Sequence, residues 1–261
     1  AALTVIFAAQ FTKIKIDTNP KNMLPPTLEV RVLNDEVETA FSLYEDMLIL
    51  AVENKKGVVN TATLSNIKTI TGRVALIKGV ASRDLTSFTT IDNVTARDGA
   101  LAVLPLMTEA PRSEEGINAL KRQLLENSLF VNRIISPDGT LAAIYIPLEK
   151  GVNAKAVSDE IKAALKGVKG DEKYYLTGDP VVRDTFGGEM FKLMGIFSPI
   201  SGMIMFAAIY IMFRSIALAA SMMAVAMVSI IWSMGLFIWL GYPVHIMSSM
   251  APVFLMAIAT D

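Results

Sequence analysis

The sequence predicts two kinds of structure in one chain. The first is an α+β domain of ferredoxin-like split β-α-β units, and the second is an all-α bundle of transmembrane helices. One observation behind this is the distribution of charge: of 24 basic and 25 acidic residues, only Arg214 and Asp261 lie after Lys192. A soluble domain needs charge over its whole surface, so the last part is not an ordinary solvated domain. The other observation is that strand-like and helix-like apolar patterns alternate before that point.

Both ends of the chain are apolar. Residues Ala1–Phe11 are hydrophobic but shorter than the roughly 20 residues that span a bilayer. Asp261 ends the chain within another apolar run. We therefore expect residues 1–15 to be the tail of a first transmembrane helix and residues 16–189 to form the α+β domain. Residues 190–261 then hold helices two and three and part of a fourth.

The first half of the predicted domain begins with an amphipathic helix from Thr27, in which Val30, Leu33, Val37 and Phe41 recur at helical spacing. The run Met47–Val52 is wholly apolar and predicts a buried strand, and a helix is expected over Thr61–Lys78. Two further strands are expected at Leu85–Ile91 and Ala100–Leu106, separated by Asp92, Asn93 and the turn at Asp98-Gly99.

The second half repeats this alternation. Ser113 is expected to cap a helix that carries two glutamates in its first turn. Strands are expected at Phe130–Ile135 and Leu141–Leu148 on either side of a Ser-Pro-Asp-Gly-Thr turn. Asn153 is expected to cap the next helix, and Lys173–Thr177 is expected to be the last strand.

The apolar part predicts spans at Met190–Phe213 and Ile216–Leu240, with a third after Pro243. Arg214, in the turn between the first two spans, is the only basic residue in a loop among the spans. Basic loops tend to stay in the cytoplasm, which favours a cytoplasmic position for this turn. Trp239 and Tyr242 favour the opposite interface. The α+β domain is therefore expected outside the cytoplasm.

Asp261 is the strongest candidate for a functional residue. An ionisable group at membrane depth is costly, and such groups usually serve ion or proton pathways. The alternative is that the helix ends there and Asp261 lies at the wet interface. His245 is the only histidine; it can titrate near neutral pH, but an ordinary interfacial position is the favoured interpretation.

Three charged residues, Asp179, Arg183 and Asp184, lie where the domain meets the first complete span. They are candidates for coupling domain movement to the helices, although capping and surface solvation explain them about as well. The sequence has no cysteine and one histidine, so neither a metal site nor a cofactor nor an enzyme is expected. The net charge of −1 gives no reason to expect a nucleic-acid partner.

Four stretches resemble a known family: YEDMLILAVEN (44–54), SFTTIDNV (87–94), YYLTGDPVVRDTF (174–186) and YPVHIMSSMAPVFLMAIATD (242–261). They are similar to permeases of the resistance-nodulation-division (RND) superfamily, in its MMPL-like group of exporters of hydrophobic and amphiphilic compounds. The resemblance covers essentially the whole chain as the first half of such a permease.

The resemblance implies that the α+β domain is a porter domain in the periplasm and that the protein is multi-pass in a bacterial inner membrane. It implies that Asp261 matches a proton-relay carboxylate, with Ala257 where the motif often has glycine. Such proteins exchange inward proton flow for outward movement of lipids or drugs, so the expected partners are membrane lipids and an amphiphilic substrate. Whether copies of the chain form a homo-oligomer stays open.

Two other classes of function are compatible with these residues. One is a sterol- or lipid-handling protein of the patched type, or an accessory subunit of protein export, in the same superfamily. The other is a membrane-anchored adaptor with no transport of its own. An adaptor has no need of an intramembrane acid, so protonation of Asp261 separates the adaptor from the transporter.

Overall fold

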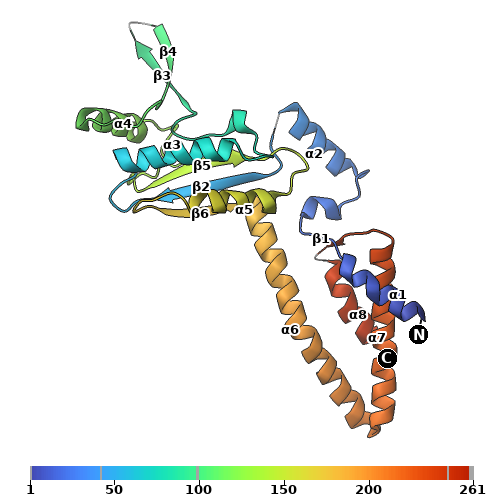
Figure 1. The fold of residues 1–261 in the computed structure, drawn as a ribbon. Coiled ribbons are helices and arrows are strands. Elements are labelled where there is room, and N and C mark those ends of the chain that lie inside the picture. Colours follow the sequence, from blue (N-terminus) through green and yellow to red (C-terminus); the bar gives the residue numbers. More distant parts are fainter. Residues whose placement is uncertain (1, 42, 98–99, 246, 259–261) are drawn as a thin grey trace. The chain divides into compact units, whose positions relative to one another are not determined.

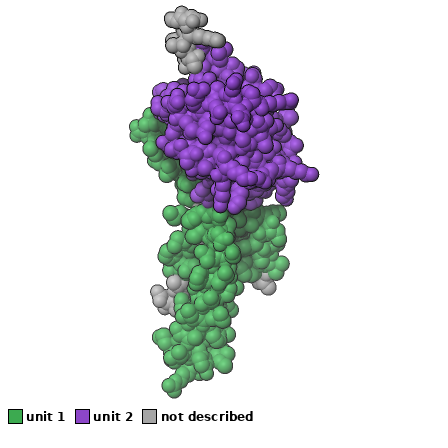
Figure 2. Space-filling view, turned by 90° about the vertical axis from the view of Figure 1, so that its left-hand side faces the viewer, with its two compact units in different colours: residues 1–34, 183–261 green, residues 35–182 purple. Residues whose placement is uncertain are grey.

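The structure is a computed structural model, and it describes residues 2–41, 43–97, 100–245 and 247–258. The chain divides into two compact units, one of residues 35–182 and one of residues 1–34 with 183–261 (Figure 2). Mixed helix and strand in the first unit, and long apolar helices in the second, confirm the coarse fold class. The predicted domain boundaries at residues 15/16 and 189/190 depend on where the membrane surface lies, so they stay predictions.

The sheet of residues 35–182 has three strands, β2 (Met47–Glu53), β5 (Leu141–Pro147) and β6 (Lys173–Gly178). Its order is β5-β2-β6, and β2 pairs antiparallel with both neighbours (Figure 1). Burial alternates along β2, and Leu48, Leu50 and Val52 are fully buried. This alternation follows from the two-residue period of a strand with one face against a core.

Helices α3 (Thr61–Ala75) and α5 (Ala154–Leu165) supply the other half of that core. Leu64, Ile67 and Ile161 are at most 1% exposed and belong to the same cluster as the buried side chains of β2. Each such side chain stabilises the fold by about 1.5–3 kcal/mol relative to exposure. Asparagine side chains cap both helices: Asn60 accepts a hydrogen bond from the Thr63 amide at the start of α3, and Asn153 accepts one from the Ala156 amide at the start of α5.

The predicted strand at Leu85–Ile91 is wrong. The chain there forms turns, because the Ser87 and Thr90 side chains hydrogen-bond local backbone and compete with strand pairing. The described backbone of this segment pairs with the sheet at Thr86, through an antiparallel bridge to Tyr145, while Leu85 and Phe88 are buried in the core. The strand begins instead at Asp92, and β3 (Asp92–Arg97) pairs antiparallel with β4 (Ala100–Pro105). The predicted turn at Asp98-Gly99 lies outside the described residues.

The predicted strand at Phe130–Ile135 is also wrong. Helix α4 (Glu114–Glu126), capped by Ser113 as predicted, ends at Asn127, and a series of turns follows it. Phe130, Ile134 and Ile135 are buried all the same. A short apolar run therefore indicated burial correctly but not strand geometry. Of the expected hairpin, the antiparallel bridge of Ile135 to Ala142 is present, and the Ser136 and Ala143 amides donate to the Leu141 and Ile134 carbonyls.

The other unit contains the apolar helices. Helix α6 (Asp179–Phe213) starts directly from β6, and α7 (Ile216–Trp239) follows after two residues, as predicted. Both are long and apolar enough to cross a membrane. Arg214 makes the turn in a left-handed conformation (φ 49°), and the Ser215 hydroxyl accepts from the Leu218 amide to cap α7.

Three shorter α-helices are α1 (Ala2–Gln10), α2 (Glu29–Ala40) and α8 (Ala251–Ile258). Helix α1 packs against α7, where the Phe7 ring contacts Trp232 and Trp239 and the Trp232 indole donates to Thr4. The close approach depends on Gly235, because a Cβ there would lie 2.5 Å from the Phe7 Cβ. Small residues commonly permit such contacts between apolar helices.

Candidate functional site

His245 lies in a two-stranded parallel sheet formed by segments far apart in the sequence. Strand β7 (Val244–His245) follows the turn after α7 and pairs with β1 (Ile16–Asp17). The pairing places Asp17 opposite His245, and the Val244 amide donates to the Lys15 carbonyl at 2.7 Å. The third apolar helix, α8, therefore begins later than Pro243, after β7 and a short 3₁₀ helix at Ser248–Met250.

The His245 imidazole faces the carboxylate of Asp17. Its Nδ1 lies 3.3 Å from the Asp17 carbonyl oxygen and 4.0 Å from the carboxylate Oδ2. The two side chains are only 18% and 25% exposed.

Both members of this pair are held in place by local hydrogen bonds. The Asp17 carboxylate accepts from the Asn19 amide and from the Asn22 side chain, each at 2.9 Å. The His245 amide donates to the Ser248 hydroxyl at 2.8 Å, and that hydroxyl donates back to the His245 carbonyl at 3.0 Å. The contact between the two chain segments is thus fixed from both sides.

Sequence reasoning identified His245 but missed Asp17. The one local signal was an acid followed by Thr-Asn-Pro, a turn-forming series, in a connector that otherwise carries lysines. That signal predicts a turn and not a histidine partner. The two residues are 228 positions apart, so only the pairing of β1 with β7 brings them together.

The three charged residues predicted at the junction lie in the first two turns of α6. Asp179 is its first residue and is exposed, whereas Arg183 and Asp184 are half-buried. None of the three is without an interaction partner. A negative charge at the first position also complements the positive end of the helix dipole. Their proposed coupling role stays a prediction.

Asp261 lies outside the described residues, as α8 is described to Ile258. Its role as a proton relay therefore stays a prediction as well. Among the residues that the structure describes, no group of three histidine, aspartate or glutamate side chains is arranged to hold a metal ion.

A buried polar network in the α+β unit was not predicted. The Thr63 hydroxyl, fully buried, accepts from the side-chain amides of Asn54 and Asn60 at 2.9 Å and donates to Glu172 at 2.6 Å. All three hydrogen-bonding positions of the hydroxyl are used. Burial, followed by the nearby Glu172 charge, raises the pKa of Tyr174 to about 12. The network joins β2, α3 and the start of β6, which makes it structural.

One comparison identifies the family. The MMPL family matches residues 25–261, which include the α+β unit and all the apolar helices after it. No curated protein matches the chain. The match covers far more than half of the 261 residues. The chain therefore belongs to the MMPL family, a family of RND-type membrane transporters of lipids or hydrophobic compounds.

Proposed function

We propose that the protein carrying this chain is a proton-coupled exporter of lipids or other amphiphilic compounds in a bacterial inner membrane. The observation that carries the proposal is the family match over residues 25–261, which spans the α+β unit and the apolar helices together. Asp261 is the proposed relay carboxylate. The proposal includes no enzymatic activity, because its chemistry is proton transfer coupled to movement of the substrate.

The α+β unit is proposed to be a porter domain on the periplasmic side. The order of its strands supports this: β6, β2 and β5 are neighbours, Thr86 forms an antiparallel bridge to Tyr145 of β5, and Val80 forms one to Leu148 directly after β5. That is the strand order of a ferredoxin-like split β-α-β unit, with α3 and α5 as its two helices. The charge of Arg214 at the α6–α7 turn supports a cytoplasmic position for that turn.

The contact between His245 and Asp17 is proposed to hold the segment after α1 against the segment before α8. This gives a means by which movement at one of these helix ends would be passed to the other. It is a coupling role, separate from the relay itself.

Transport in proteoliposomes tests the proposal. With an imposed pH gradient and a fluorescent lipid as substrate, Asp261→Asn is expected to abolish gradient-driven export, since an amide cannot exchange a proton. Asp261→Glu is expected to keep part of the activity. His245→Ala is expected to reduce export without abolishing it, because it removes the contact with Asp17.

Two results would count against the proposal. Undiminished export by Asp261→Asn would exclude the relay role. An absence of gradient-driven export in the unsubstituted protein would favour the membrane-anchored adaptor. Equal protein incorporation, measured for each variant, is the control.

A further inference from the structure

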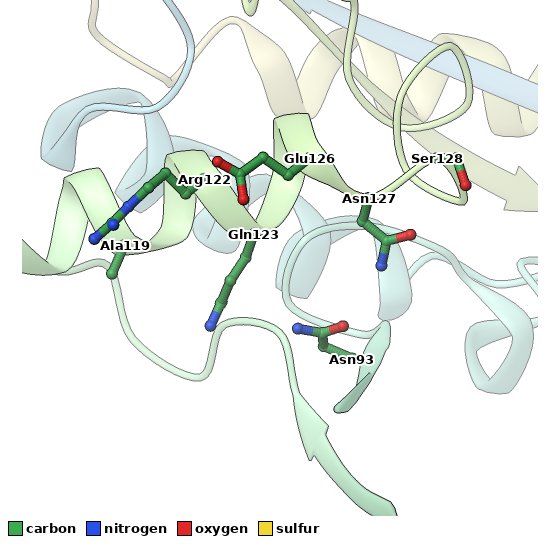
Figure 3. Close-up of a pocket in the computed structure, with 7 residues that line it drawn as sticks. All are labelled: Asn93, Ala119, Arg122, Gln123, Glu126, Asn127 and Ser128. Carbon is green, nitrogen blue, oxygen red and sulfur yellow. The ribbon is translucent and has the colours of Figure 1, made fainter. Parts of the chain in front are cut away.

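A pocket of about 580 Å³ lies in the α+β unit between α4 and the beginning of β3 (Figure 3). This volume is within the range of small-molecule sites in proteins. Of the seven lining residues, only Ala119 is apolar and none is aromatic. The polar ones are Asn93, Arg122, Gln123, Glu126, Asn127 and Ser128.

Asn93 is the most informative of these residues. It is 8% exposed, and within the described part of the chain its side-chain amide has no hydrogen-bond partner. This amide can therefore both donate to and accept from a ligand. Figure 3 shows the Gln123 and Asn127 side chains pointing from the side of α4 toward the Asn93 amide. The unpaired group thus faces the pocket.

The wall formed by α4 also has unused hydrogen-bonding capacity. Arg122 and Glu126 are four residues apart on α4, yet neither forms an ion pair among the described residues. Gln123, likewise, has no side-chain partner there. The guanidinium only donates, the carboxylate only accepts, and the amides do both. The lining therefore offers both hydrogen-bond donors and acceptors, and the opposite charges of Arg122 and Glu126 leave it with no net charge.

We propose that this pocket binds a neutral, hydroxyl-rich ligand, namely a sugar or another polyol. Each hydroxyl both donates and accepts, which matches a lining of amides, one guanidinium and one carboxylate. An anion would meet the Glu126 carboxylate, and an apolar group would cover the polar side chains of the lining without hydrogen-bonding them. With no ring in the lining, recognition depends on hydrogen bonds and not on stacking. This goes beyond the proposed export function and does not depend on it.

The hydroxyl groups of the ligand belong either to a free sugar or to the headgroup of an amphiphile. The full chain in lipid nanodiscs would be titrated with maltose and with hexyl maltoside, and binding followed by saturation-transfer NMR. Hexylphosphocholine, with the same tail and a zwitterionic headgroup, is the comparison. Saturable binding of both maltose probes with similar affinity indicates a free sugar, and much tighter binding of hexyl maltoside indicates a headgroup. Either result supports the proposal.

Variants locate the binding. Gln123→Ala removes an exposed side chain without disturbing the core, and Asn93→Ala removes the buried amide. Each is expected to weaken maltoside binding about three- to tenfold, the effect of one neutral hydrogen bond. Lys121→Ala, on the same helix outside the pocket, is the matched control and should bind normally.

Three results would overturn the proposal: no saturable binding of either maltose probe, unchanged affinity in Gln123→Ala, or equal binding of hexylphosphocholine. The last would assign the pocket to zwitterionic ligands instead. Loss of export in the Asp261→Asn variant with normal maltoside binding separates the two proposals, because the pocket and the relay are then tested independently.

Discussion

Gly178 is expected to be the least replaceable glycine in the α+β unit. It is the last residue of β6, has φ +127°, and lies opposite Leu48 in the sheet. A Cβ at this position would lie 2.3 Å from the Met47 carbonyl oxygen and 3.0 Å from the Leu48 Cα. Both are backbone atoms of β2, so a side-chain rotation cannot relieve the overlap. Gly178→Ala must therefore move one strand away from the other.

The expected cost has two parts. The positive φ costs a residue other than glycine about 1–3 kcal/mol. Displacing packed backbone costs about 1–3 kcal/mol more, as in an overpacked core. A total near 4 kcal/mol would speed hydrogen exchange of the paired β2 amides by about a thousandfold. Mass spectrometry of peptides from β2 measures this directly in the micelle-bound protein.

Gly188→Ala is the matched control. Gly188 lies ten positions further along in α6, and a Cβ added there would meet no atom within 4 Å. Alanine at this position is expected to stabilise the helix by about 1 kcal/mol. If the β2 amides exchanged no faster in Gly178→Ala than in Gly188→Ala, the reasoning from the positive φ and the overlap of the added Cβ with the β2 backbone would be refuted.

Two further predictions concern polar side chains of the same unit. Thr63→Val removes the hydrogen bonds that the hydroxyl makes to the buried Asn54 amide, to Asn60 and to Glu172, and is expected to cost about 2–4 kcal/mol in urea unfolding; Thr63→Ser, which keeps the hydroxyl, should cost far less. Hydrogen bonds from Ser136 and Thr140 lower the pKa of Asp138 to about 2. That carboxylate's contribution to stability is present above its unfolded pKa and is lost as pH falls toward 2. Ser136→Ala should raise the pKa in a carbon-13 NMR titration, so that the loss begins at higher pH; an unchanged pKa would contradict this.

The elements that the sequence predicted well are those whose signals are local. The apolar run of β2, the asparagine and serine caps, and the two-residue turn before α7 depend on neighbours in the chain. The segments at 85–91 and 130–135 were misassigned as strands because their side chains are buried without strand pairing. An apolar run indicates that a segment is buried. It does not show whether the segment pairs as a strand, because strand pairing depends on partners that are distant in the sequence.

The candidate sites show the same division. His245 stood out as the only histidine, yet its contact with Asp17 exists because two short segments pair in register. Thr63 gave no signal at all, since a threonine in the first turn of a helix is ordinary. Its importance comes from Glu172, which the fold brings within hydrogen-bonding distance.

Asn93 shows why a functional position is easily lost at the level of sequence. Asparagine is depleted in strands and favoured in turns, so Asp92 and Asn93 were expected to separate two strands. In the structure Asn93 belongs to β3 and pairs with Leu104 of β4, and its side chain makes no hydrogen bond to the described residues. Asparagine has a low strand propensity, so it weakens the strand locally. Positions that break local rules are often those that function requires, and at Asn93 the side-chain amide can hydrogen-bond a ligand in the pocket.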